Sequence, residues 1–215
     1  MDAVAFSAGA ATVLAAWQLV PQVAKLHRVA LPAGLSPTWA LLGISTNVAW
    51  VAYRWSQGLW LGLPSPVIAA LLYAATLWLI VRSMPSLRWA GLAGLGWFSC
   101  VGAAAALGGW VLVGTVLGLS SGLQAAPSIW AAYRSRRPVG IAPSLWVIGL
   151  AQAVLWGYYG WANADFALVL YGITLSLAAL LILGRYGYAH RLARNYGPSI
   201  PIASQMATPR TSLRS

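Results

Sequence analysis

Apolar residues recur along the chain in long runs, separated by short segments rich in proline, glycine and basic residues. A transmembrane helix needs about 20 mostly apolar residues, which is close to the length of these runs. The pattern therefore predicts an all-α integral membrane protein with seven transmembrane helices and no soluble domain. The predicted spans are 4–26, 38–55, 63–81, 89–107, 110–133, 144–162 and 166–184.

Composition supports this interpretation. Hydrophobic residues make up 60% of the 215 residues and charged residues 7%, whereas a soluble domain carries about a quarter charged residues. The single cysteine, Cys100, excludes an intrachain disulfide and a cysteine-based metal cluster. We expect neither a metal nor a cofactor.

The net charge of +11 is compatible with a nucleic-acid partner or an anionic membrane surface. Seven spans leave Arg54 on one side with both acids, Asp2 and Asp165, and place the other basic residues opposite. Basic residues mark the cytoplasmic side, which predicts an outer N-terminus, an inner C-terminus and the lipid bilayer, not nucleic acid, as partner. The inner basic residues are Lys25, Arg28, Arg82, Arg88, Arg134, Arg136, Arg137, Arg185, Arg191, Arg194, Arg210 and Arg214.

An internal repeat relates the two halves of the chain at an offset of 106 residues. The matching pairs are Gln18/Gln124, Pro21/Pro127, Arg28/Arg134, Pro32/Pro138, Gly34/Gly140, Pro37/Pro143, Gly43/Gly149, Val48/Val154, Trp50/Trp156, Tyr53/Tyr159 and Trp55/Trp161. Residue types other than the abundant Ala and Leu dominate these pairs, so chance similarity between apolar helices is excluded. Two three-helix units in one orientation need a linker helix between them, as in parallel-repeat transporters. We predict a first unit at 1–85, a linker helix at 86–108, a second unit at 109–185 and a basic, irregular cytoplasmic tail at 186–215.

Two prolines, Pro21 and Pro127, occupy equivalent places in the inner halves of the first and fifth predicted spans. A proline inside a helix removes a backbone hydrogen bond, so the pair is interpreted as two hinges; a static kink is the alternative. Amide and hydroxyl side chains accompany them, and these either face a water-filled cavity or hydrogen-bond between helices. These polar residues are Gln18, Gln22, Gln124 and Ser128.

Aromatic and amide residues share one face in the second and sixth predicted spans. Trp50 and Trp156 lie a couple of turns inside their spans, which favours a ligand pocket over an interfacial aromatic belt. One face of the second span carries Asn47, Trp50 and Tyr53, and one face of the sixth carries Gln152, Trp156 and Tyr159. No predicted span has a charged residue near its centre, so proton coupling, a charged channel filter and intramembrane catalysis are all disfavoured.

These motifs resemble the PQ-loop superfamily and its SWEET and semiSWEET sugar-transporter branch over residues 5 to about 185. The first copy carries Pro21-Gln22, Gly34-Leu35-Ser36 and Trp50-x-x-Tyr53. The second carries Pro127-Ser128, Gly140-Ile141-Ala142, Trp156-x-x-Tyr159 and Asp165. The resemblance implies alternating-access facilitated diffusion, with Pro21 and Pro127 as hinges and Trp50 and Trp156 clasping the substrate.

The chain departs from that branch where its sugar-binding asparagines lie, because these positions are Pro66 and Gly172 here. Ser128 also replaces the glutamine of the PQ pair. These departures bear on sugar specificity more than on transport, and Asn47 and Gln152 are the candidates to supply the missing amides.

The sequence thus predicts a passive uniporter in the cell membrane for a small neutral polar solute, with a sugar as the best single choice. The alternatives are a PQ-loop transporter of an amino acid or another metabolite, and a membrane receptor or scaffold that does not transport. A homo-oligomer is possible but not required, since a duplicated chain can form a pore alone.

Overall fold

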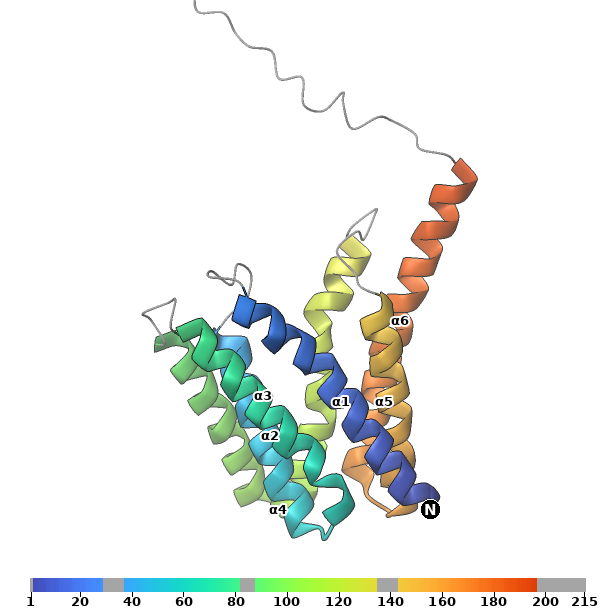
Figure 1. The fold of residues 1–215 in the computed structure, drawn as a ribbon. Coiled ribbons are helices and arrows are strands. Elements are labelled where there is room, and N and C mark those ends of the chain that lie inside the picture. Colours follow the sequence, from blue (N-terminus) through green and yellow to red (C-terminus); the bar gives the residue numbers. More distant parts are fainter. Residues whose placement is uncertain (1, 29–36, 82–87, 135–142, 197–215) are drawn as a thin grey trace, which may run out of the picture.

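The computed structural model describes residues 2–28, 37–81, 88–134 and 143–196, and within these ranges it is helical with no strand (Figure 1). The elements are α1 (Ala3–Arg28), α2 (Pro37–Ser56), the 3-10 turn η1 (Trp60–Gly62), α3 (Pro64–Val81), α4 (Arg88–Arg134), α5 (Pro143–Ala162) and α6 (Phe166–Tyr196). The expectation of an all-α chain is therefore confirmed for the described residues.

Prolines and one glycine set several helix boundaries. Pro37, Pro64 and Pro143 each form the first residue of a helix, where the missing N–H is not needed and the fixed φ already suits a helix. Gly109 interrupts α4 with φ 60° and ψ −153°, a conformation that is essentially restricted to glycine. Two helices of opposite direction therefore meet there, at the break predicted between the fourth and fifth spans.

Helices α2 and α5 end in the same way. Leu59 N–H donates to the Arg54 carbonyl at 2.9 Å, and Asp165 N–H donates to the Gly160 carbonyl at 2.8 Å. This six-to-one bond is typical of the Schellman motif, which needs a left-handed residue just before the donor. Gly58, with φ 71°, and Ala164, with φ 53°, occupy that position. The two caps are again 106 residues apart.

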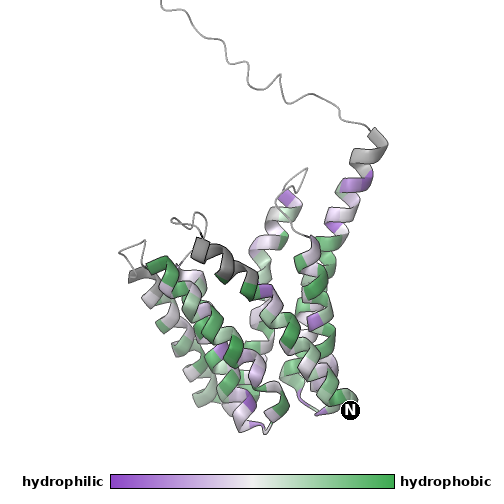
Figure 2. Ribbon diagram, viewed as in Figure 1, coloured by the Kyte–Doolittle hydropathy of each residue, from purple (hydrophilic) through white to green (hydrophobic). Residues whose placement is uncertain are grey.

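Within the described residues, four stretches are long and apolar enough to cross a membrane: Ala3–Val20, Trp60–Val81, Gly91–Arg134 and Phe166–Arg191. Hydrophobic residues run along the body of the bundle, and large apolar side chains cover its outer surface (Figure 2). Leu71, Leu107, Val111 and Leu123, for example, are 66, 84, 79 and 72% exposed. A surface this apolar matches lipid better than water, so the chain has the character of a membrane protein.

The helices close into a ring. Its contacts run from α1 to α3, α2, α4, α6 and α5, and α5 returns to α1. In Figure 1 the N-terminus, η1, the break between the two arms of α4 and the turn at 163–165 all lie at one end of the bundle, which we call the η1 end. The main apolar core includes Leu59, Val113, Leu117 and Leu168, residues close in sequence to these turns, so the bundle is packed at its η1 end.

Glycines allow the arm of α4 after Gly109 to approach its neighbours. A Cβ on Gly114 would lie 2.7 Å from the Tyr53 ring, and one on Gly118 would lie 2.8 Å from the Ala167 carbonyl oxygen. Small residues that let helices approach this closely are common at helix interfaces in membranes.

The predicted irregular tail is wrong at its start. α6 continues to Tyr196 and projects beyond the bundle in Figure 1. Residues 186–196 are therefore helical, and aromatic contacts run along this extension: Tyr186 lies 4.3 Å from His190 between ring centroids. The remainder of the predicted tail, 197–215, is outside the described residues.

Candidate functional site

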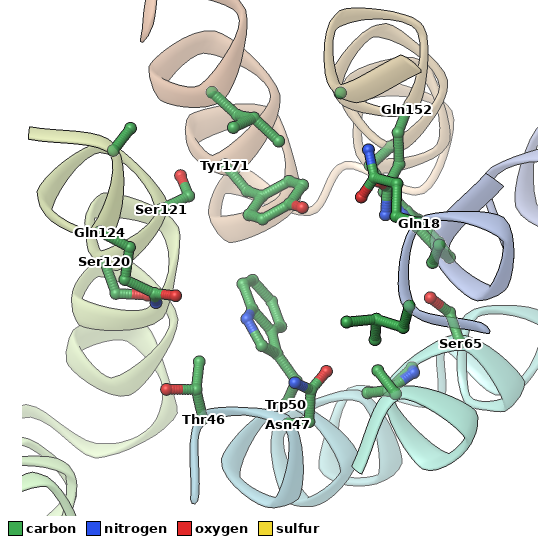
Figure 3. Close-up of a pocket in the computed structure, with 18 of the residues that line it drawn as sticks. Gln18, Thr46, Asn47, Trp50, Ser65, Ser120, Ser121, Gln124, Gln152 and Tyr171 are labelled. Carbon is green, nitrogen blue, oxygen red and sulfur yellow. The ribbon is translucent and has the colours of Figure 1, made fainter. Parts of the chain in front are cut away.

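A pocket of about 360 Å³ lies inside the ring of helices (Figure 3), within the range of small-molecule sites. Its walls combine amides and hydroxyls with aromatic rings, although the outside of the bundle is apolar. The lining residues come from α1 to α6: Ala15, Gln18, Leu19, Trp39, Thr46, Asn47, Trp50, Arg54, Ser65, Pro66, Ala69, Tyr73, Ser120, Ser121, Gln124, Ala125, Leu145, Trp146, Gly149, Gln152, Trp156, Tyr171 and Leu175.

Equivalent positions of the two sequence halves meet in this pocket. Eight pairs of lining residues differ by 106 in number: Ala15/Ser121, Gln18/Gln124, Leu19/Ala125, Trp39/Leu145, Thr46/Gln152, Trp50/Trp156, Ser65/Tyr171 and Ala69/Leu175. Most of the lining thus consists of matched positions.

The structure brings Trp50 and Trp156 together. Trp50 is 5% exposed and Trp156 is 1% exposed, and both line the pocket. The Trp50 ring meets Tyr171 edge to face at 5.7 Å between centroids, and Figure 3 shows this ring projecting into the pocket. Both indoles are therefore buried inside the ring of helices and are not exposed on its outer surface.

Arg54 is the main functional residue that the sequence analysis missed. It was placed among the outer loop charges, yet it is 4% exposed and lines the pocket. Its guanidinium carbon lies 4.0 Å from the Trp156 ring centroid and 5.2 Å from that of Trp50. Its Nη1 donates to the Gly62 carbonyl in η1, and its Nε is buried without a hydrogen-bond partner. A cation is therefore held between the two tryptophans at the η1 end of the pocket.

Four predicted amides line the pocket. Gln152 is 7% exposed, and Asn47 donates through Nδ2 to the Gly43 carbonyl of its own helix at 2.8 Å. Gln18 and Gln124 stand on opposite sides of the pocket in Figure 3. Gln18 also approaches α5, because its Nε2 lies 3.7 Å from where a Cβ on Gly149 would be. These amides can donate and accept hydrogen bonds with a polar ligand.

Tyr53 and Tyr159, the tyrosines of the two Trp-x-x-Tyr motifs and the candidates for a gate, lie outside the pocket lining. They are one turn further toward the η1 end. Each packs edge to face on its own tryptophan, at 5.7 Å and 5.6 Å between centroids. The Tyr53 hydroxyl donates to Asp165 Oδ2 at 2.8 Å, and Asp165 Oδ1 accepts from Leu168 N–H at 2.8 Å. Asp165 therefore caps α6 and also ties α2 to the turn before α6 across the η1 end.

Pro66 and Gly172, which occupy the positions of the missing asparagines, differ in their relation to the pocket. Pro66 is buried and lines the pocket. Gly172 is not among the lining residues. A Cβ on Gly172 would lie 2.7 Å from Gly157 Cα and 2.8 Å from the Ala153 carbonyl oxygen. The close approach of α5 and α6 leaves no room there for any side chain.

Gly172→Ala is expected to lower the free energy of unfolding by about 1–3 kcal/mol through overpacking. The matched control is Gly157→Ala, because a Cβ on Gly157 would meet Gly172 Cα at an ordinary 3.6 Å. Thermal unfolding of the purified proteins in detergent measures both. Equal midpoints for the two variants would contradict the assigned contact.

Of the two predicted hinges, the structure describes the side chains of only the second, at Pro127. Pro127 lies inside α4, which continues to Arg134, and Pro127 and Ser128 are both exposed. Pro21 falls within α1, but the side chains of Pro21 and Gln22 lie outside the described residues, as do Gly34 to Ser36 and Gly140 to Ala142. The hinge roles stay predictions.

Trp39 and Tyr73 were also missed. They meet at 4.9 Å between centroids and both line the pocket, although Trp39 had the position of a belt residue. Tyr171 could have been found, because it is the 106-residue equivalent of Ser65. Within the described ranges, no three His, Cys, Asp or Glu side chains gather into a metal site.

No protein-family model matches the sequence, and no match to a curated protein was found. The functional interpretation therefore rests on the residues and on the geometry of the pocket.

Proposed function

We propose that this chain is a seven-span membrane transporter that carries a small polar solute across the cell membrane by passive alternating access. The solute binds in the central pocket beside Trp50 and Trp156. The η1 end faces the outside, with the N-terminus outside and the C-terminus in the cytoplasm. As the sequence analysis predicted for a sugar, we expect the solute to carry hydroxyl groups.

The observation that carries the proposal is the pocket at the centre of the helix ring, lined by matched positions of the two halves. The contacts of the ring map onto themselves when α1, α2 and α3 are exchanged with the second arm of α4, α5 and α6. A polar pocket between two such halves, inside an apolar exterior, is typical of transporters built from parallel repeats.

Passive transport is favoured over proton coupling. Among the described residues that line the pocket there is no Asp, Glu or His, and proton-coupled transporters usually place such a group inside the membrane. Asp165, the acid nearest to this region, is engaged by Tyr53 and Leu168. The pocket therefore contains no evident proton carrier.

Uptake by proteoliposomes tests the proposal. We expect saturable uptake of at least one solute from a panel of labelled sugars, sugar acids and amino acids, at a rate unchanged by a pH gradient. Liposomes without protein are the control. Uptake that needs a pH gradient would contradict the passive mechanism. Solute binding without any uptake would instead support a membrane receptor or scaffold.

A further inference from the structure

Arg54 is a buried cation that no acidic side chain of the chain neutralises. The two acids are engaged elsewhere: Asp165 with Tyr53 and Leu168, and Asp2 with Val4 N–H at 3.3 Å. The indole faces of Trp50 and Trp156 and the Gly62 carbonyl stabilise the guanidinium. Asp165 attracts the guanidinium from a distance but forms no ion pair with it. The Nε of Arg54 is therefore unpaired, whereas buried charges in proteins are normally paired.

The pocket beside Arg54 offers no other charge. Its remaining described lining consists of amides, hydroxyls, aromatic rings and aliphatic residues. A ligand in this pocket therefore meets one positive charge at the η1 end and neutral hydrogen-bonding groups elsewhere. The complementary ligand has one anionic group at one end and neutral polar groups along the rest.

We propose that the transported solute carries a carboxylate that binds Arg54, and that it is a small hydroxylated acid such as a sugar acid. This inference rests on the proposed transport function and defines its substrate class. The planar guanidinium suits a carboxylate, to which it can donate paired hydrogen bonds. Hydroxyl groups of the same solute would bind the amides of Asn47, Gln18, Gln124 and Gln152.

An amino acid fits this lining less well. Its ammonium group is best neutralised by a carboxylate, and the described lining contains no acid. Arg54 already occupies faces of Trp50 and Trp156. A hydroxylated acid avoids this unmet requirement, because its second end is neutral.

The test compares solutes that differ in one carboxylate: D-glucose with D-glucuronate, and glycerol with D-glycerate. In proteoliposomes we expect the acid of at least one pair to be taken up with at least a tenfold lower KM than its neutral partner. Uptake of a carboxylate by a uniporter moves one negative charge. A potassium diffusion potential, positive inside, should therefore accelerate uptake of the acid and leave neutral uptake unchanged.

The preference is the KM of the neutral solute divided by the KM of its acid. Arg54→Gln should lower this ratio at least tenfold, and Arg54→Lys should lower it less. Arg134→Gln is the matched control, because Arg134 is exposed at the end of α4 and should leave the preference unchanged. If Arg54→Gln does not fold, the solute pairs and the potential dependence of the unmodified protein still decide the question.

Two failures are distinguishable. Saturable uptake of the neutral solutes with equal or better KM, indifferent to the potential, would overturn the carboxylate proposal and leave transport standing. If no solute is taken up, the proposed function fails. Thermal stabilisation of the detergent-purified protein by glucuronate or glycerate then tests Arg54 as a carboxylate site, and its absence overturns that site as well.

Discussion

Replacing Asp165 by alanine is expected to lower the free energy of unfolding by about 2–5 kcal/mol. The buried carboxylate accepts two hydrogen bonds, one from the Tyr53 hydroxyl and one from Leu168 N–H, each at 2.8 Å. Alanine removes the cap of α6 and leaves the Tyr53 hydroxyl without its acceptor. Thermal unfolding in detergent should show a midpoint lowered by roughly 5–15 °C for a chain of this size.

The other acid provides the matched control. Asp2 is exposed and accepts one longer hydrogen bond, from Val4 N–H at 3.3 Å, so Asp2→Ala should leave the midpoint almost unchanged. Tyr53→Phe removes one of the two bonds of Asp165 and should cost less than Asp165→Ala. In the double variant the two losses should not add. Equal midpoints for Asp165→Ala and Asp2→Ala would show that Asp165 does not hold the η1 end together.

The helices were largely predictable because their boundaries are local. Proline at a helix start and glycine at a break act through φ, ψ and the missing N–H of one residue, so Pro37, Pro143 and Gly109 could be interpreted from sequence alone. The pocket positions of Trp50 and Trp156 were predictable for a related reason. Their positions well inside the spans and their equivalence in the repeat can be seen in the sequence and do not depend on how the helices pack.

Arg54 was not predictable, because its burial depends on tertiary contacts. Its sequence position, at the end of a span and beside exposed Trp55 and Ser56, is that of a loop charge. The 3-10 turn η1 supplies the Gly62 carbonyl to the guanidinium, and the second half of the chain supplies the Trp156 face. Neither contact leaves a periodic signal near position 54. The crowding at Gly172 was likewise not predictable, because it arises where α5 and α6 approach each other and not from the sequence of one helix.

One signal for Arg54 was nevertheless present in the repeat. Its equivalent in the second half is Gly160, whose Cβ would lie 2.6 Å from Leu168 Cβ. The first half therefore places a long cation where the second half is too crowded for any side chain. Such a difference between otherwise matched positions marks the feature that makes the pocket asymmetric. On the carboxylate proposal it would also orient the solute, with the anionic end toward Arg54 at the η1 end.

A cysteine at position 65 is expected to react with membrane-impermeant thiol reagents from both faces of the membrane. A transporter exposes its pocket to each face in turn, whereas a scaffold does not. Ser65 lines the pocket and is 6% exposed. Buried Leu59, Tyr53 and Tyr159 close the η1 end in this conformation, so labelling from outside requires that end to open. Ser65→Cys is made in a Cys100→Ser background, because Cys100 is exposed.

Two further serines calibrate the labelling in the same background. Ser56 is exposed at the η1 end of α2, and Ser144 is exposed at the opposite end of α5. Ser56→Cys should react at least tenfold faster from outside, and Ser144→Cys at least tenfold faster from inside. Saturating solute should slow the reaction of Ser65→Cys from either face. Reaction of Ser65→Cys from one face alone would mean that the pocket never changes sides, because the bonds at the η1 end would then be permanent, and a binding role without transport would follow.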